Sequence, residues 1–142
     1  MLSKNEIVVL KQIRENSRET LSSMSKKINI PISTIFEILK RLERKVVSKH
    51  VSLLDFSKLG YGLKVNFLLK ASDKDLLRQF LVQNSSINDV STCLNEHDFY
   101  IKCIFSSMKD YSNFKDELEK NGADFEETFV LEELKKEGFS NF

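Results

Sequence analysis

The 142-residue chain has no tryptophan, one proline, four glycines and two cysteines. Cys93 and Cys103 are too few for a disulfide framework, and together with His97 they fit no usual zinc spacing, so we expect no metal site. No glycine-rich nucleotide motif is present, and we expect no bound cofactor. No apolar run approaches the ~20 residues that span a bilayer, and charges interrupt the N-terminal segment, unlike a signal peptide. These absences favour a cytoplasmic protein without a membrane partner.

The charges that are present divide unevenly along the chain, although the net charge is only +1. Residues 1–62 hold 12 Lys/Arg and 6 Asp/Glu, a net charge of +6, whereas residues 63–142 hold 10 and 15, a net charge of −5. A basic and an acidic half indicate different partners for each half. The basic half has the charge that phosphate contacts require.

The N-terminal half predicts two helices followed by a tight turn. Ser3 and Glu6 form the S-x-x-E pattern of a capping box, which opens a helix that ends near Asn16. A second helix starts near Thr20, and Asn29-Ile30 then forms a turn. Pro31 suits the start of a third helix, where its missing N–H has no partner to lose.

The third predicted helix, from about Ile32 to Lys45, is two-sided. One stripe at 100° per residue is apolar and contains Ile35, Ile38, Leu39, Leu42 and Val46. The opposite side is polar and basic, with Ser33, Glu37, Lys40 and Arg44 flanked by Thr34, Phe36 and Arg41. An ordinary solvated helix often shows this pattern. The preceding helix, the short turn and the basic half favour a helix-turn-helix, whose second helix lies in the major groove of DNA.

A wing and a hinge are predicted after this helix. Alternation of apolar and polar residues over 47–53 indicates a short strand or hairpin, in which Lys49 and His50 are placed to meet phosphate, although a plain surface role for His50 is the more common outcome. The segment LDFSKLGYG contains Gly60 and Gly62 and is interpreted as the hinge. We therefore predict a winged helix-turn-helix domain over residues 1–58 and a second domain over residues 59–142.

The second half alternates strands and helices. Strands are predicted over 64–71, 87–94, 99–105 and 125–131, with helices opened by Ser72-Asp73 and Ser107 and the second helix ended by Gly122. The order β-α-β-β-α-β is the ferredoxin-like split, with both helices on one face of an antiparallel sheet. The fold class is thus α+β.

The sheet face without helices is expected to have a partner. Leu68, Tyr100 and Ile104 place apolar side chains on the face opposite the helices. Apolar residues on both faces indicate burial of the second face. A homodimer through the sheet is the natural prediction, because two-fold dimers are how helix-turn-helix proteins read paired half-sites.

At this level of detail the chain resembles the Lrp/AsnC family, the leucine-responsive and asparagine-regulatory transcription factors of archaea and bacteria. The segments ISTIFEILKRLERKVV, LLDFSKLGYG and CLNEHDFYIKCIF carry the resemblance. It implies a regulator that binds promoter DNA as a dimer or higher homo-oligomer, with residues 59–142 as a RAM-type domain for dimerisation and effector binding. The DNA contacts implied by the resemblance, together with the wing lysine, are Ser33, Thr34, Glu37, Lys40, Arg41, Arg44 and Lys49.

Two positions depart from the family pattern. Val46 stands where the family usually has a glycine after the recognition helix, so the turn into the wing is expected to differ. The resemblance also implies an amino-acid or other small-molecule site at the turn Asn95, Glu96, His97 and Asp98. Asn95 occupies the position of a family glycine, and asparagine tolerates positive φ better than most residues but lacks the close approach that glycine allows.

Two other functions stay open at this point. Siroheme decarboxylases look similar to this family and are enzymes, but this chain has no tryptophan, and its two histidines, His50 and His97, fall in different predicted domains. We therefore expect no catalytic activity. A protein-interaction module on the same two-domain fold is the third possibility, and it predicts neither porphyrin binding nor salt-sensitive DNA binding.

Overall fold

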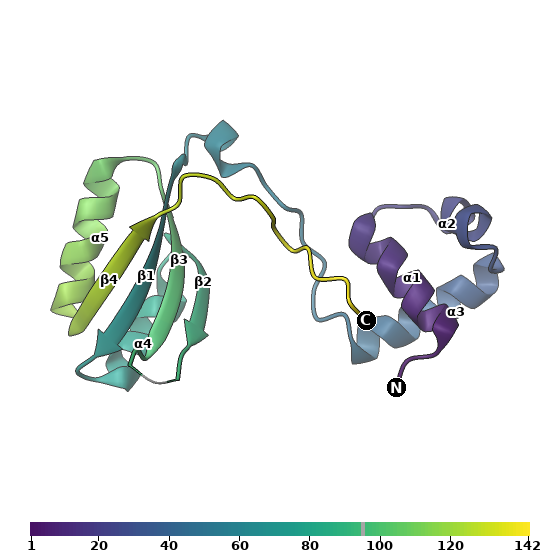
Figure 1. Cartoon of the computed structure of the whole chain (residues 1–142), viewed down its shortest axis with the longest axis horizontal. Coiled ribbons are helices and arrows are strands. Elements are labelled where there is room, and N and C mark those ends of the chain that lie inside the picture. Colours follow the sequence, from purple (N-terminus) through teal and green to yellow (C-terminus); the bar gives the residue numbers. More distant parts are fainter. Residues whose placement is uncertain (95) are drawn as a thin grey trace. The chain divides into compact units, whose positions relative to one another are not determined.

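The computed structural model describes residues 1–94 and 96–142, so Asn95, which the sequence placed in an effector site, lies outside the described residues. The chain forms two compact units. Unit 1 contains Met1–Leu53 together with Glu137–Phe142, and unit 2 contains Leu54–Lys136. The chain passes twice between them (Figure 1). None of the helices seen in these residues is long and apolar enough to cross a membrane.

Unit 1 is built on three helices, α1 (Lys4–Glu15), α2 (Leu21–Ile28) and α3 (Ile32–Lys45). The predicted capping box at the start of α1 is confirmed, because Ser3 and Glu6 each bond the other's backbone N–H. The Thr20 hydroxyl accepts from the N–H of Ser23 and opens α2, also as predicted. Because these hydrogen bonds join residues close in the sequence, the starts of α1 and α2 could be predicted from the sequence.

The turn between α2 and α3 is tight because Asn29 adopts a left-handed conformation, with φ 55° and ψ 42°. Asparagine is among the few non-glycine residues that enter this region readily. The Ser25 hydroxyl donates to the carbonyl of Ile30 at 2.6 Å and so fixes the chain just before Pro31. The turn thereby sets where α3 begins.

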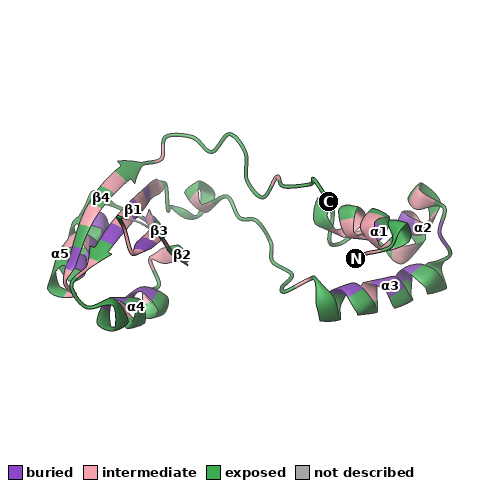
Figure 2. Ribbon diagram, turned by 60° about the horizontal axis from the view of Figure 1, so that its bottom comes forward, coloured by how far each residue is buried: buried purple, intermediate pink, exposed green. Residues whose placement is uncertain are grey.

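A small core joins the three helices on one side of α3. Figure 2 shows the buried residues of α3 on the side that faces α1 and α2, and exposed residues on the other side. The buried residues of this core are Val9, Met24, Ile30, Ile35, Ile38 and Leu42. The inclusion of Val46 in the buried stripe was wrong: α3 ends at Lys45, and Val46 is its exposed C-cap residue.

The predicted strand over residues 47–53 is not formed. The chain from Val47 to Leu53 has no regular secondary structure, and both Val51 and Leu53 are exposed. A strand needs a neighbour for its backbone N–H and C=O groups, and no strand in unit 1 is described that could pair with this segment. Alternation of side chains alone was therefore a misleading signal here.

Unit 2 is a four-stranded antiparallel sheet with two helices. A 3-10 turn η1 (Phe56–Leu59) precedes β1 (Leu63–Ala71), α4 (Lys74–Gln83), β2 (Ile87–Thr92), β3 (Phe99–Phe105), α5 (Met108–Lys120) and β4 (Ala123–Phe129). The strand order β2-β3-β1-β4 is that of the predicted ferredoxin-like split. The α+β fold class is confirmed.

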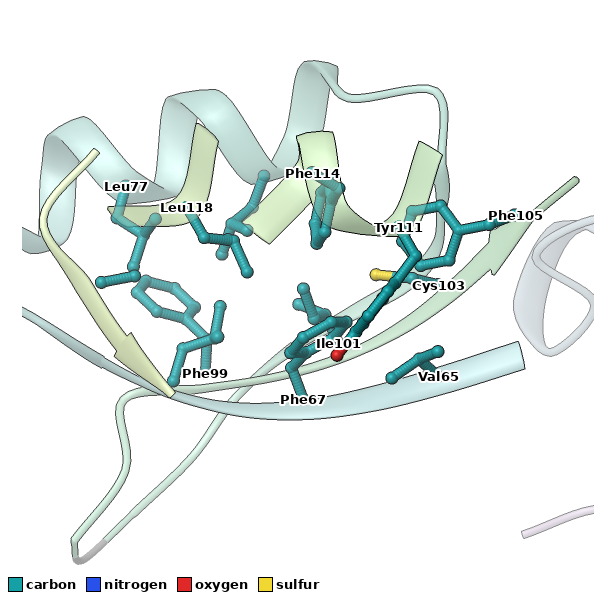
Figure 3. Packing of buried hydrophobic residues seen from close by; sticks show 13 residues of the cluster. Val65, Phe67, Leu77, Phe99, Ile101, Cys103, Phe105, Tyr111, Phe114 and Leu118 are labelled. Atoms are coloured by element: carbon teal, nitrogen blue, oxygen red, sulfur yellow. The ribbon is translucent and has the colours of Figure 1, made fainter. Parts of the chain in front are cut away.

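The core of unit 2 lies between the sheet and its two helices (Figure 3). Phe67 on β1 is fully buried, and its ring centroid lies 5.6 Å from that of Phe114 on α5. Leu77 of α4 and Leu118 of α5 reach the same sheet face. Both helices therefore cover one face, as predicted, and the opposite face carries the half-buried Leu68, Tyr100 and Ile104.

Two details of unit 2 could not be read locally. Tyr100 on β3 pairs with Ser91 on β2, a register that no local pattern in the sequence specified. Gly122 ends α5 with φ +73°, and a Cβ there would lie 2.1 Å from the hydroxyl oxygen of Ser72. The N–H of Ser72 also donates to the Gly122 carbonyl at 2.9 Å, and the positive φ favours glycine at this position, while a side chain there would displace the Ser72 hydroxyl.

Candidate nucleic-acid interface

The outward face of α3 carries the residues predicted to contact DNA. Lys40, Arg41 and Arg44 are all exposed, and at about 100° per residue they lie within one arc of α3. The other face of the helix is fixed in the core by Ile35, Ile38 and Leu42. The remaining predicted contacts are exposed as well: Ser33, Thr34 and Glu37 lie on α3, and Lys49 lies in the irregular segment that follows it.

The first turn of α3 is open to an anion. Pro31 precedes the helix and offers no side-chain hydrogen bond to its amides. Uncapped N–H groups and the positive end of the helix dipole favour phosphate at such a position. Ser33 and Thr34 are exposed within this same turn.

One lysine of this face is held by an aromatic side chain. The Lys40 ammonium lies 4.3 Å from the centroid of the Phe36 ring, one turn earlier on α3. Phe36 is 45% exposed, so it forms a flat apolar platform beside the cation. A cation over a ring is attracted by the ring's quadrupole, so the Phe36 ring favours this position of the Lys40 ammonium.

Arg41 has an acidic partner that the sequence did not indicate. Its Nε lies 3.5 Å from a carboxylate oxygen of Glu6 on α1. The Ser3 N–H and hydroxyl donate to the same carboxylate, and with the nearby Arg41 charge they lower the pKa of Glu6 below its ordinary value. Glu6 is therefore ionised at neutral pH and offsets part of the positive charge of α3.

Three of the four predicted effector residues, Glu96, His97 and Asp98, lie within the described part of the chain. Glu96 is exposed, and His97 lies 3.7 Å from the Glu126 carboxylate. The Asp98 carboxylate is already engaged, since it accepts from the N–H of Ala71 at 2.9 Å and pairs with Lys74 at 2.7 Å.

These two contacts give Asp98 a structural role. The Ala71 hydrogen bond and then the Lys74 charge lower the pKa of the Asp98 carboxyl below its usual range. Because Ala71 ends β1 and Lys74 begins α4, the carboxylate joins the end of one strand to the start of the next helix.

A separate hollow of about 680 Å³ lies in unit 2, away from the β2–β3 turn. Phe56, Tyr61, Asn84, Asp110 and Glu117 are among the residues that line it. The lining contains neither Asp98 nor His97. The volume is within the range of small-molecule sites.

The structure offers no further metal or thiol chemistry among the residues it describes. No group of three or more His, Cys, Asp or Glu side chains is arranged to hold a metal ion there. Cys93 and Cys103 are both free, and burial strongly raises the pKa of the Cys103 thiol.

Comparison with known proteins matches residues 2–45 to the winged helix-turn-helix DNA-binding family. An uncharacterized HTH-type transcriptional regulator of Pyrococcus furiosus is 28% identical over 135 residues, covering 92% of this chain and 91% of the relative. A transcriptional regulator of Neisseria meningitidis, solved in complex with L-Met, is 26% identical with a TM-score of 0.87, covering 96% and 94%. An AsnC family transcriptional regulator from Agrobacterium tumefaciens shares the fold, with a TM-score of 0.86, 15% identity and coverage of 95% and 94%.

The matched residues 2–45 include α1, α2 and the whole of α3, and the structural likeness extends over both units. The chain therefore carries a DNA-binding domain that matches the winged helix-turn-helix family over residues 2–45, is similar over nearly its whole length to HTH-type transcriptional regulators, and shares with the AsnC family structure the fold in which this domain precedes a ferredoxin-like domain.

Proposed function

We propose that α3 is the recognition helix and that Lys40, Arg41 and Arg44 supply most of its affinity for duplex promoter DNA. The observation that carries this proposal is the division of α3 into a face fixed in the core and a face with three exposed cations. Arginine and lysine contact phosphates and guanine edges, and phosphate contacts supply most of the sequence-independent affinity.

The other exposed residues take supporting roles in this proposal. Ser33 and Thr34 approach the DNA backbone at the start of α3, where uncapped amides favour phosphate. Lys49 meets a phosphate from the segment after the helix. Glu37 accepts a hydrogen bond from a base amino group in the major groove.

The test is the salt dependence of DNA binding. Lys40→Ala combined with Arg44→Ala removes two cations per subunit, or four in a dimer, and lowers the slope of log affinity against log salt by about 3.6. A matched control removes the same charge from exposed positions of unit 2, Arg78→Ala with Lys109→Ala, and leaves the slope unchanged. Equal slopes for the two double variants on the protein's own promoter would contradict the proposal.

We further propose a homodimer, or a higher homo-oligomer built from it, with residues 1–58 binding DNA and residues 59–142 assembling the subunits. The half-buried Leu68 and Tyr100 lie opposite each other on β1 and β3, on the sheet face that no helix of unit 2 covers, and so support assembly through this face. Light scattering at micromolar concentration tests it. Leu68→Glu is expected to yield a monomeric mass, and a monomeric wild-type protein would contradict the assembly.

We propose that an amino acid or a similar small molecule modulates this assembly at the turn from Asn95 to Asp98. Support comes from the L-Met complex of the Neisseria meningitidis regulator. A ligand ammonium at Asp98 replaces the Lys74 ammonium that now pairs with this carboxylate.

Calorimetric titration with L-methionine, other amino acids and uncharged analogues tests this proposal. Asp98→Asn abolishes binding if the turn is the site. Glu117→Gln, in the separate hollow of unit 2, is the matched control and leaves the affinity unchanged. The reverse result would move the ligand to the hollow.

We propose that the protein acts in the cytoplasm, at the DNA it regulates, without catalysis. The support is that the Pyrococcus furiosus relative is named as a transcriptional regulator. The remaining enzyme hypothesis, a siroheme-decarboxylase-like activity, predicts a coloured porphyrin complex, which absorbance after incubation with siroheme detects.

A further inference from the structure

The last six residues of the chain lie on the first helix of unit 1. Glu137–Phe142 belongs to this unit although unit 2 intervenes in the sequence. The contact centres on Arg14 of α1, whose Nε donates to the Phe139 carbonyl at 2.7 Å and whose Nη2 donates to the Glu137 carbonyl at 3.0 Å. One guanidinium therefore holds two backbone carbonyls of the same turn.

Charged and aromatic contacts surround these two hydrogen bonds. The Glu137 carboxylate lies 3.6 Å from the same Arg14 side chain. The Lys11 ammonium, one turn earlier on α1, lies 5.7 Å from the centroid of the Phe142 ring, and the rings of Phe142 and Phe139 are 6.2 Å apart. Residues three apart on a helix share a face, so Lys11 and Arg14 together present one cationic surface to the segment.

The backbone of the segment is shaped for this contact. Glu137 has φ +50°, a left-handed conformation that non-glycine residues adopt infrequently. Gly138 follows it, and the turn that results points the carbonyls of Glu137 and Phe139 at one side chain. The fork of donors on arginine fits two such acceptors, whereas lysine has a single nitrogen to share between them.

We propose that the outer surface of α1, formed by Lys11 and Arg14, is a docking site for the chain's own C-terminal segment, Glu137–Phe142. This segment is the partner for the α1 surface because it is covalently attached to the same chain. The attachment gives it an effective concentration on the order of millimolar, so a modest affinity for α1 is enough to keep it bound. Once docked, it gives unit 2 a second connection to the DNA-binding unit, in addition to the chain that leaves α3. Truncation after Lys136 removes that connection and no residue of either core.

The first test measures the order of the segment in the full-length protein. In the wild type, heteronuclear NOE values for the amides of residues 137–142 match those of α1. Arg14→Ala lowers them to the values of a free chain end, and Arg14→Lys, which keeps the charge but not the fork, lowers them substantially. The control Arg18→Ala, an exposed arginine of the same unit, leaves them unchanged. A free segment in the wild type, or an ordered one in Arg14→Ala, overturns the proposal.

The second test asks whether the segment docks on its own chain. Glu15 and Ser140 line the same hollow between α1 and the segment, so cysteines at these two positions suit a short bismaleimide. The experiment uses Cys93→Ser, and the buried Cys103 stays in place. A crosslinked product with the mass of one chain supports the proposal. A product with the mass of two chains shows docking on a second copy and overturns it.

Discussion

Replacement of Glu6 by glutamine is expected to strengthen DNA binding. Glu6 lies 3.5 Å from the Nε of Arg41, and its lowered pKa keeps it charged at neutral pH. DNA must therefore compete with this carboxylate for Arg41. Glutamine fills the same position of a capping box, so the start of α1 is retained while the competing charge is removed.

The expected magnitude follows from the geometry and the charge. Exposed ion pairs of this kind change an equilibrium by no more than about fivefold, which sets the gain per subunit at low salt. Release of Arg41 adds one phosphate contact per subunit, which steepens the slope of log affinity against log salt by about 0.9, or about 1.8 for a dimer. Between 50 and 200 mM salt, Glu6→Gln is thus expected to lose about tenfold more affinity than the wild type.

The assay is fluorescence anisotropy on the protein's own promoter at several salt concentrations. Glu15→Gln is the matched control, because it removes the same charge from an exposed position of α1 that does not touch Arg41. The double variant Glu6→Gln with Arg41→Ala isolates the pair, and in it the gain disappears. If Glu15→Gln gave the same gain, or if Glu6→Gln left the slope unchanged, the reasoning would be refuted.

Three further predictions concern unit 2. Ile101→Val is expected to lower the free energy of unfolding of unit 2 by about 1 kcal/mol and its melting temperature by roughly 4–8 °C, and to leave the transition of unit 1 unchanged. Ile38→Val is expected to lower the melting temperature of unit 1 alone, because the two cores share no residue. Calorimetry measures both transitions. Asp98 has a lowered pKa in the folded state, so it stabilises the fold above its unfolded pKa of about 3.9 and loses this effect as pH falls through the lower folded value. Asp98→Asn therefore makes stability fall less steeply at acid pH in a denaturation series, and an unchanged pH dependence would contradict the structural role of the Asp98 carboxylate. A maleimide at neutral pH is expected to modify only Cys93 in the native protein, because burial shields the Cys103 thiol and raises its pKa. After unfolding, both cysteines react. Rapid modification of both in the native protein would show that the core opens.

Features with local causes were predicted well from the sequence. The starts of α1 and α2 depend on side chains that accept from backbone N–H groups three residues away. The apolar stripe of α3 follows the helical period, so its buried face was visible except at Val46, where the helix ends. Val9, the buried residue of α1, could not be identified as a core residue from the sequence. The apolar residues of α1 occur on more than one side of the helix, so the helical period does not distinguish Val9 from them.

Features that join distant residues were not predicted. Glu6 looked like a capping residue and nothing more, because its neighbour Arg41 is brought near only by the packing of α1 against α3. Asp98 was predicted to bind an effector, but its carboxylate already pairs with the ammonium of Lys74. The prediction of a strand over residues 47–53 was wrong although the alternation of apolar and polar residues was present. A strand also needs a partner strand, which a local pattern does not reveal.

The collision that a side chain at Gly122 would cause with Ser72 has an evolutionary consequence. Positions on the exposed side of α3 can be substituted at little cost to the fold, since their side chains pack against few neighbours. Position 122 has no such freedom, because the backbone there has positive φ and a side chain would displace the Ser72 hydroxyl. When relatives of this chain are aligned, we expect this glycine to persist where the exposed residues of α3 have diverged, and to be the better marker of common descent.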